Sequence, residues 1–322
     1  MKLFKNKNIL IIGDVMLDSY LFGNVERISP EAPVPIVDVL IKQNKLGGAA
    51  NVATNIKNLG GNPILCSVIG KDQKGEIFLS LLKNYNISNS YIYQSANRIT
   101  TDKTRIIGNN HQMLRIDEEI KSELLSDQPH FLSLINDAFK QEKIDCVLFQ
   151  DYDKGVLNET IITLITEKAK SLNIPVIVDP KKKNFNNYNN VTLFKPNFKE
   201  FKEGLNLIGT DRKELLEEGS KILHKRGIEI VFITLSENGI FVSYKKYNKI
   251  INKIIPGTAR EVVDVSGAGD TVISVISMLI SDIEVEEIAK ISNIAGGIVC
   301  EEIGVVPINK DKLLKEYKEY GS

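Results

Sequence analysis

The chain has 322 residues, of which 43% are hydrophobic and 25% charged, enough to bury the core of one large domain or of two smaller ones. Lysine plus arginine and aspartate plus glutamate each number 41, so the net charge of zero supplies no field for nonspecific binding to nucleic acid or membranes. The three cysteines lie far apart in apolar runs, which is typical of buried free thiols in a reducing compartment.

The basic N-terminus is followed by a short apolar run at residues 9–12, which ends in Gly13 and Asp14. This run is too short for a signal peptide or a membrane span and predicts a first β-strand. We therefore expect a cytoplasmic protein.

Short β-branched runs then alternate with amphipathic helical stretches. The near-continuous apolar runs, typical of strands buried on both faces, are residues 9–12, 64–69, 146–149, 176–178, 191–194 and 230–235. The helical patterns are at about residues 48–59, 74–84, 122–142, 158–172 and 210–226. This alternation predicts an α/β fold with a mainly parallel sheet and helices on both faces.

Two early segments interrupt the alternation with short strands and no helix between them. They are residues 15–46 and residues 89–118. We expect them to form a small β-sheet lid that stands off the main sheet and could close over a substrate or pack against a second subunit. The polar run at residues 181–190 predicts a solvated loop, and the lack of a long linker predicts a single domain over residues 1–322.

Residues 263–271 predict an anion-binding helix start that contains a carboxylate. Gly267 and Gly269 lack a Cβ, so backbone N–H groups there can converge on phosphate oxygens at the positive end of the helix. A carboxylate beside a bound polyphosphate is electrostatically costly, so its presence indicates that Asp270 has a chemical role, which is to accept a proton from an attacking hydroxyl. The alternative interpretation is a turn with a helix cap.

Other polar motifs follow strands, at the sheet edge where α/β proteins bind ligands. Asp14 and Asp18 follow the first strand and could accept hydrogen bonds from a polyhydroxy ligand, although either one alone would suggest a helix cap or a surface charge. Residues 47–51 open a helix with small side chains. Asn51 there could bind a sugar hydroxyl, and tight helix packing is an equal alternative.

Two later motifs are also ambiguous. Residues 197–200 form a possible capping box, which needs no ligand, but near a nucleotide Glu200 could order water around Mg²⁺. Residues 234–239 could hold nucleotide phosphates or ribose, although their Asn-Gly pair also predicts a hairpin between strands such as residues 240–245 and 249–255. There is no P-loop motif and no Gly-x-Gly-x-x-Gly after the first strand.

Together these motifs resemble the ribokinase-like, or PfkB, family of carbohydrate kinases over nearly the whole chain. The family's N-terminal signature matches residues 47–51, and its C-terminal signature, Asp-Thr-x-Gly-Ala-Gly-Asp, matches residues 264–270 with Val265 in place of threonine. Five segments are further similar to family members that phosphorylate D-glycero-β-D-manno-heptose 7-phosphate: residues 13–18, 27–35, 112–117, 151–155 and 264–273. The unusual segment 27–35 is the most specific of them.

The resemblance implies a ribokinase-like three-layer α/β/α fold, ATP and Mg²⁺ as cofactors, and phosphorylation of the heptose phosphate at O1, a step toward ADP-heptose for lipopolysaccharide cores. It implies that Asp270 is the base and that the N–H groups of Gly267, Ala268 and Gly269 form the anion hole. The implied nucleotide residues are Asn197, Phe198, Lys199, Glu200, Thr234, Ser236, Gly239 and Asn293, with Glu200 also at the Mg²⁺ site. The implied sugar residues are Asp14, Asp18, Gly48 and Asn51.

The substrate's 7-phosphate needs cations, and each candidate alone is more typical of a surface charge. The candidates are Arg105, Arg115, Lys103, Lys154 and Arg27. An exposed lid edge predicts a homodimer. Many relatives carry a C-terminal nucleotidyltransferase domain, and because this chain ends at Ser322 we expect kinase activity alone, with a separate enzyme for nucleotide transfer. Another sugar or sugar-phosphate kinase of the same fold, or a noncatalytic nucleotide-binding protein, are the alternatives.

Overall fold

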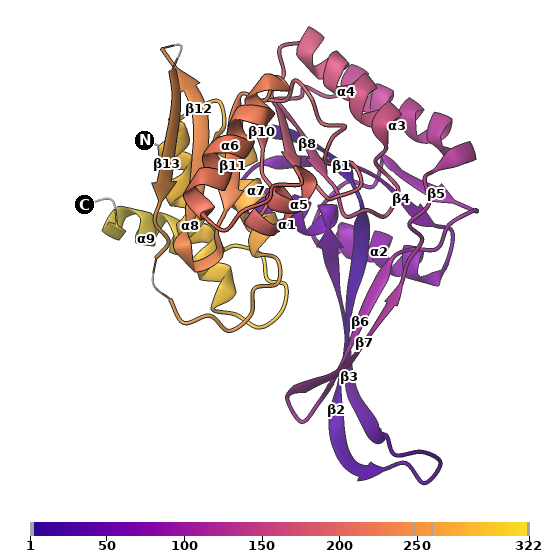
Figure 1. Cartoon of the computed structure of the whole chain (residues 1–322). Coiled ribbons are helices and arrows are strands. Elements are labelled where there is room, and N and C mark those ends of the chain that lie inside the picture. Colours follow the sequence, from indigo (N-terminus) through magenta and orange to yellow (C-terminus); the bar gives the residue numbers. More distant parts are fainter. Residues whose placement is uncertain (1–2, 248, 259, 321–322) are drawn as a thin grey trace.

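The apolar runs of the chain pair into one nine-stranded sheet, with the order β13-β12-β11-β10-β9-β8-β1-β4-β5 (Figure 1). The computed structural model describes residues 3–247, 249–258 and 260–320, so Ser322 lies outside the described residues. The strands are β1 (Asn8–Gly13), β4 (Asn62–Gly70), β5 (Ile92–Ser95), β8 (Cys146–Gln150), β9 (Val176–Asp179), β10 (Leu193–Phe194), β11 (Ile230–Thr234), β12 (Ile240–Lys246) and β13 (Lys249–Ile255). Pairing is parallel from β5 to β11 and antiparallel in β11-β12-β13, which confirms a mainly parallel sheet.

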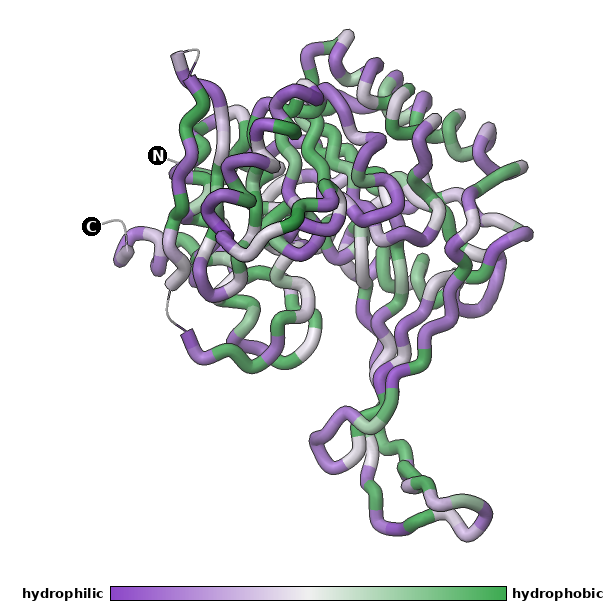
Figure 2. The backbone as a smooth tube through the Cα atoms, viewed as in Figure 1, coloured by the Kyte–Doolittle hydropathy of each residue, from purple (hydrophilic) through white to green (hydrophobic). Residues whose placement is uncertain are grey.

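Helices cover both faces because the strands are apolar on both faces. In β1, Ile9 and Ile11 pack into one core, while Leu10 and Ile12 pack into the other. Figure 2 shows these hydrophobic strands at the centre of the molecule. The first core includes α1 (Ala49–Leu59), α2 (Gln73–Asn84), α7 (Ala268–Leu279), α8 (Val285–Cys300) and α9 (Lys310–Tyr320). The second includes α3 (Gln128–Gln141), α4 (Glu159–Ser171), α5 (Phe198–Gly204) and α6 (Arg212–Lys225).

Helix α3 begins at Gln128, later than the predicted start at residue 122. A 3₁₀ turn at Leu125–Asp127 precedes it, and a proline occupies its first turn, where a missing N–H is tolerated. Within the described part of the chain, no helix is both long and apolar enough to span a membrane.

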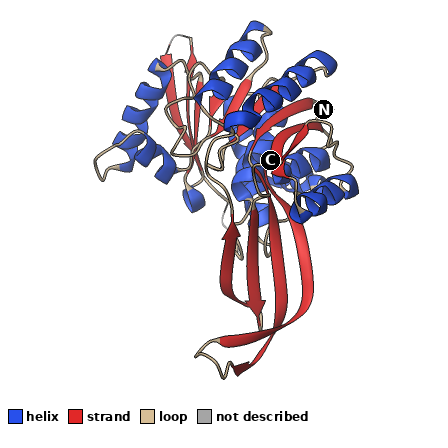
Figure 3. Cartoon of the chain, turned by 90° about the vertical axis from the view of Figure 1, so that its right-hand side faces the viewer, coloured by secondary structure: helices blue, strands red, loops and turns tan. Residues whose placement is uncertain are grey.

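A second sheet of four strands projects from the body, as the view in Figure 3 shows. Its order is β3-β2-β6-β7, and its strands are β2 (Val15–Ile28), β3 (Pro35–Gly48), β6 (Asp102–Gly108) and β7 (His111–Glu118). This sheet, called the lid below, grows directly from the carboxyl end of β1. Part of the predicted lid segment 89–118 lies elsewhere, because Ile92–Ser95 pairs with β4 as the edge of the main sheet.

The polar run at residues 181–190 is not the solvated loop that its composition predicts. Phe185 and Tyr188 are fully buried within it, and Phe185 packs edge-on against Phe194 with ring centroids 4.9 Å apart. Arg226, at the end of α6, donates hydrogen bonds of 2.9 Å to the carbonyls of both Phe185 and Tyr188. Two aromatic side chains thus anchor an otherwise polar segment to the core.

The cysteines are free thiols. Cys66 and Cys146 are buried, and burial raises the pKa of both thiols. Cys300 is only half-buried, so the prediction of buried thiols is confirmed for two of the three.

We expect Phe185→Ala to lower the free energy of unfolding by about 3–5 kcal/mol, because it empties a fully buried aromatic position. Chemical denaturation of the variant and the wild type measures the difference. The matched control is Lys182→Ala, an exposed side chain in the same run, with an expected change below about 0.5 kcal/mol. Equal small effects of the two substitutions would show that the run is solvated.

Candidate active site

Asp270 lies in the first turn of α7, at the carboxyl edge of the main sheet, with its side chain buried. Gly267 precedes the helix with a φ of 82°, a left-handed conformation that favours glycine. Gly267, Gly269 and Asp270 line one cavity of about 220 Å³. The glycines therefore open a helix whose positive end faces a space of the size of a phosphate group and its neighbours, as the sequence predicts.

Three neutral side chains hold the carboxylate of Asp270. Its Oδ1 accepts hydrogen bonds from the Tyr152 hydroxyl at 2.6 Å and from Gln150 Nε2 at 3.0 Å. Its Oδ2 accepts one from Asn51 Nδ2 at 2.8 Å. Since each carboxylate oxygen has about two acceptor directions, Oδ1 is saturated and Oδ2 keeps one direction open. An attacking hydroxyl can therefore deliver its proton to Oδ2.

Burial raises the pKa of Asp270 to about 6. The hydrogen bonds from Tyr152 and Asn51 oppose this shift, the charge of Asp179 adds to it, and the charge of Lys195 opposes it. A carboxylate that titrates this close to neutrality accepts a proton more readily than an ordinary aspartate. The environment thus suits Asp270 to the role of a general base.

Two lysines that are not among the predicted site residues reach the same cavity. Lys195, which follows β10, lies 3.0 Å from Asp179 and is almost fully buried. Lys181, which follows β9, forms an ion pair with Glu200. Burial lowers the pKa of Lys181, but the nearby carboxylates raise it by more, so it stays charged. A Cβ on Gly269 would lie 3.9 Å from Lys195 Nζ, so this cation lies close to the helix start.

The signal that could have found these lysines is their position one or two residues beyond the carboxyl ends of neighbouring strands. The sequence places Lys181 after Asp179-Pro180 and Lys195 directly after Phe194. The parallel pairing of β9 with β10 then brings the two ends together.

The capping box at the start of α5 is present. Asn197 accepts from the backbone N–H of Glu200 at 2.8 Å, and Glu200 accepts from the backbone N–H of Asn197 at 2.9 Å. Both residues and Thr234 line the cavity. Phe198 and Lys199 do not, since Phe198 contacts Arg212 and Lys199 extends toward Glu203 on the exposed side of the helix.

The oxygen donors in the cavity fit a hydrated Mg²⁺ ion. Asp179 and Glu200 both line it. Among the described residues, no three His, Cys, Asp or Glu side chains form a direct metal site. Glu200 already pairs with Lys181 and with a backbone N–H, so the donor set suits contact through the ion's water shell, which Mg²⁺ usually keeps.

The remaining predicted nucleotide residues lie together beside the cavity, at the end of β13. Ser236 begins a 3₁₀ turn, and Gly239 follows it with a φ of 89°, where a Cβ would overlap the carbonyl of Ile255. Asn293, on α8, donates to the carbonyls of Ile255 and Pro256 at 3.0 Å each. These contacts fix the hairpin end next to Thr234.

Asp14 holds the loop that follows β8. Its carboxylate accepts hydrogen bonds from the backbone N–H groups of Tyr152 at 2.8 Å and of Lys154 and Val156 at 3.1 Å each. Burial raises the pKa of Asp14, and these three hydrogen bonds oppose the rise. Gly48 lies beside it, where a Cβ would be 2.5 Å from the carbonyl of Asp14. The predicted sugar ligand Asp14 is thus mainly engaged with the protein backbone.

One face of the lid carries a cationic cluster at its root. Arg105 pairs with Asp18 at 2.6 Å, and both Arg105 and Lys45 lie 5.4 Å from the ring centroid of Tyr20. Burial lowers the pKa of Lys45, which the sequence reasoning did not single out. Arg27 lies on the same strand as Asp18 but is exposed, farther along β2.

The other predicted phosphate-binding cations already have carboxylate partners. Lys103 pairs with Asp117 at 3.1 Å and with Glu119 at 3.2 Å. Lys154 pairs with Glu119 at 2.8 Å, and Arg115 pairs with Asp117 at 2.7 Å. The two carboxylates offset the positive charge of this part of the lid.

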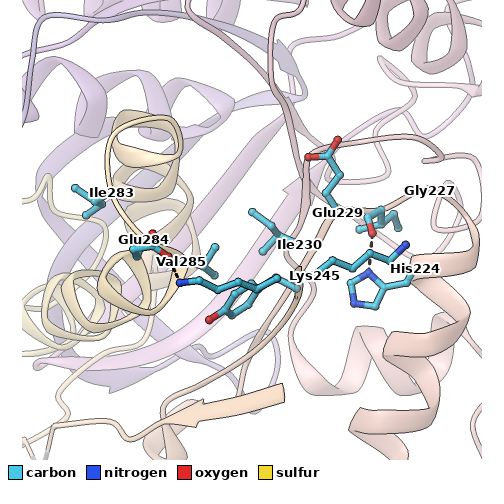
Figure 4. A pocket seen from close by; sticks show the side chains of 11 residues that line it. His224, Gly227, Glu229, Ile230, Lys245, Ile283, Glu284 and Val285 are labelled. Atoms are coloured by element: carbon cyan, nitrogen blue, oxygen red, sulfur yellow. Dashed lines mark hydrogen bonds and ion pairs between the residues drawn. The ribbon is translucent and has the colours of Figure 1, made fainter. Parts of the chain in front are cut away.

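A larger cavity, of about 590 Å³, lies at the opposite edge of the sheet (Figure 4). Strand β11 runs from Ile230, in that cavity, to Thr234 in the cavity of Asp270. Both ring nitrogens of His224 are engaged there, with the carbonyl of Ile228 at 2.8 Å and the hydroxyl of Ser243 at 2.9 Å. This histidine therefore has a structural role.

The chain is similar to known proteins in sequence and in fold. A family model described as pfkB family carbohydrate kinase matches residues 6–312. The chain is 38% identical over 315 residues, 98% of its length, to the bifunctional protein HldE of Methylobacillus flagellatus, and 36% identical over 312 residues, 97% of its length, to that of Helicobacter hepaticus. It spans 64% of the length of each.

The crystal structure of phosphofructokinase-2 from Escherichia coli in complex with potassium has the same fold. The TM-score is 0.79 at 19% identity, covering 99% of this chain and all of that one. The predicted ribokinase-like fold is thereby confirmed. The chain belongs to the pfkB family of carbohydrate kinases, which implies ATP as the phosphoryl donor.

Asp270→Asn is expected to lower kcat by about 10²–10⁴-fold, because an amide of the same shape cannot accept the proton. ADP release in the presence of a sugar acceptor measures the loss, and the KM for ATP should change little. Asp211→Asn, at the exposed start of α6, is the control and should leave kcat unchanged. Near-normal turnover of the Asp270 variant would remove this residue from the role of base.

Proposed function

We propose that this pfkB-family kinase transfers the γ-phosphoryl group of ATP to O1 of D-glycero-β-D-manno-heptose 7-phosphate in the cytoplasm, giving the 1,7-bisphosphate for ADP-heptose and lipopolysaccharide core synthesis. The observation that carries the proposal is the identity of 36–38% to bifunctional proteins HldE over nearly the whole chain. The resemblance of residues 27–35 to heptose 7-phosphate kinases supports it. The proposal is confined to the kinase reaction.

In the proposed reaction, the anomeric hydroxyl approaches the open side of Asp270 Oδ2, beside the amide of Asn51. Its proton passes to Oδ2 as the oxygen attacks the γ-phosphorus in line; the O1–P bond forms, the bond to the bridging β–γ oxygen breaks, and ADP leaves. An anomeric hydroxyl is more acidic than an ordinary alcohol, which eases this proton transfer. The N–H groups of Gly267 and Gly269 and the charges of Lys181 and Lys195 stabilise the phosphoryl oxygens, while the N–H of Ala268 already donates to the carbonyl of Val265 at 3.3 Å.

Asp179 and Glu200 would hold Mg²⁺ through its water shell on the same wall of the cavity. The ion would neutralise phosphate charge when bound.

The lid face at Tyr20 supports a phosphorylated acceptor. Lys45 donates to the carbonyl of Val305 at 3.0 Å, and Arg105 pairs with Asp18. The charges of Asp18 and Asp264 act on both cations, but Lys45 bonds a neutral carbonyl group. Lys45 also lines a small cavity together with Asn51, which contacts the base. We therefore place the 7-phosphate near Lys45 and Arg105.

The test is ADP release from Mg·ATP across a panel of acceptors: heptose 7-phosphate, unphosphorylated heptose, fructose 6-phosphate, ribose, adenosine and none. We expect turnover that depends on heptose 7-phosphate, with a much higher KM for unphosphorylated heptose because the lid cations lose their ligand. Turnover on another acceptor would keep the fold and the role of Asp270 but discard the lipopolysaccharide role. If no acceptor in the panel gave ADP release although the protein bound ATP, the result would favour an untested acceptor or the noncatalytic alternative.

The lid also supports a homodimer, which we include in the proposal. Its strands expose apolar side chains over much of their length, visible as hydrophobic segments in Figure 2. The most exposed on the strands are Ile28, Leu40, Ile41 and Leu114, each at 55–69%. An apolar surface of this kind beside the open sheet edges of β3 and β7 is typical of a protein–protein interface.

We expect a Leu40→Lys, Ile41→Lys double variant to sediment as a monomer at micromolar concentration while the wild type sediments as a dimer, because the added charges oppose burial of the lid. Ile208→Lys, at an exposed position on the body, is the control and should remain dimeric. Analytical ultracentrifugation distinguishes the two states. A monomeric wild type would contradict the dimer.

A further inference from the structure

The hydroxyl of Tyr152 lies 2.6 Å from Asp270 Oδ1, the shortest of the three hydrogen bonds to this carboxylate. We propose that Tyr152 is a positioning residue for phosphoryl transfer: its hydroxyl holds Asp270 through Oδ1, leaves Oδ2 for the acceptor and keeps the carboxylate ionised. The inference deepens the proposed function and rests on it for the role of Asp270 as base, but not for the identity of the sugar.

Contacts hold both the backbone of the loop at Tyr152 and the ring of this residue. Asp14 accepts from the backbone N–H of Tyr152 itself. The preceding residue, Asp151, is buried and accepts from the hydroxyl of Tyr188 at 2.8 Å. The ammonium of Lys181 lies 5.5 Å from the centroid of the Tyr152 ring. With its backbone and its ring both held, the phenol presents its hydroxyl to Asp270 without a large loss of conformational freedom.

Tyr152 acts as a donor. Burial and then the charges of Asp270 and Asp179 raise the pKa of the phenol well above its ordinary value, so it stays protonated. A hydrogen bond donated to a carboxylate stabilises its charged form. Gln150 is a weaker holder of the base, because its Nε2 also lies 3.4 Å from Asp179.

The charged groups around Asp270 come from the ends of neighbouring strands. Asp179 ends β9 and raises the pKa of Asp270, while Lys195 follows β10 and lowers it. These two groups pair with each other at 3.0 Å, so their effects on the base partly cancel. Lys181 lines the same cavity and pairs with Glu200. Burial and the neutral donors, Tyr152 first among them, therefore set the charge state of the base.

The test is the pH profile of Tyr152→Phe. In the wild type, kcat/KM should fall below about pH 6, because protonated Asp270 cannot accept a proton. Without the phenol hydroxyl the ionised carboxylate is less stable, its pKa rises, and the acid limb should move up by about one pH unit. The variant should then be about fivefold slower than wild type at pH 6 and within about threefold of it on the alkaline plateau.

An infrared titration of the ligand-free protein supplies a readout that needs no sugar. The carboxyl band absent from Asp270→Asn identifies Asp270, and its midpoint should rise in Tyr152→Phe. 3-Fluorotyrosine at position 152, a stronger donor of nearly the same shape, should move the midpoint the opposite way. If heptose 7-phosphate gave no ADP release but the midpoint of Asp270 still shifted as expected, only the proposed substrate would be overturned.

Tyr93→Phe is the matched control, since that hydroxyl also faces a carboxylate, Asp127, at 3.4 Å but lies at the far edge strand β5. Tyr93→Phe should change neither the pH profile of kcat/KM nor the infrared midpoint of Asp270. Two results would overturn the positioning role of Tyr152. The first is an infrared midpoint of Asp270 that stays unchanged in both variants at position 152. The second is a kcat/KM that falls by the same factor at every pH, so that the acid limb of the profile does not move.

Discussion

The buried carboxylate of Asp270 is the feature on which the arrangement of the site depends. Removing an ionised carboxylate from water is costly unless donors surround it, and here the donors come from separate elements. Strand β8 and the loop after it supply Gln150 and Tyr152, and α1 supplies Asn51. The parallel pairing of β1 with β8 and the packing of α1 against α7 bring these elements to one point. The fold therefore has to be complete before the base can be both buried and ionised.

The loop after β8 joins this base to the lid. Asp14, between β1 and β2, accepts hydrogen bonds from three backbone N–H groups of that loop. Lys154, within the loop, pairs with Glu119, which follows β7. Gly155 allows the loop to pass close to the segment that follows β7, since a Cβ there would overlap the carbonyl of Ser122. The loop after β8 thus connects the root of the lid with Asp270 through a few backbone and side-chain contacts.

The sequence predicts local features of this site and misses those that depend on strand order. The glycines before Asp270 and the capping box of Asn197 are encoded within a few residues, so their helix starts could be predicted. Tyr152 and Lys195 are far from Asp270 in sequence and approach it only because β8, β9 and β10 are neighbours, an order that no local pattern specifies. Composition also gives a wrong prediction where a few side chains determine whether a segment is buried. In the polar run at residues 181–190, two buried aromatic residues fix the segment to the core.

The choice of neutral donors around the base has a physical reason. Lys195 and Lys181 lie in the same cavity, but each pairs with another carboxylate, Asp179 or Glu200. A direct ion pair with Asp270 would lower its pKa and weaken it as a base, whereas no donors at all would leave it protonated. Burial raises the pKa of Asp270, and the neutral hydrogen bonds from Tyr152 and Asn51 oppose the rise, which leaves it at about 6. Both lysines line the same cavity, and in the proposed reaction their positive charge would stabilise the phosphoryl group in the transition state instead of the ground state of the base.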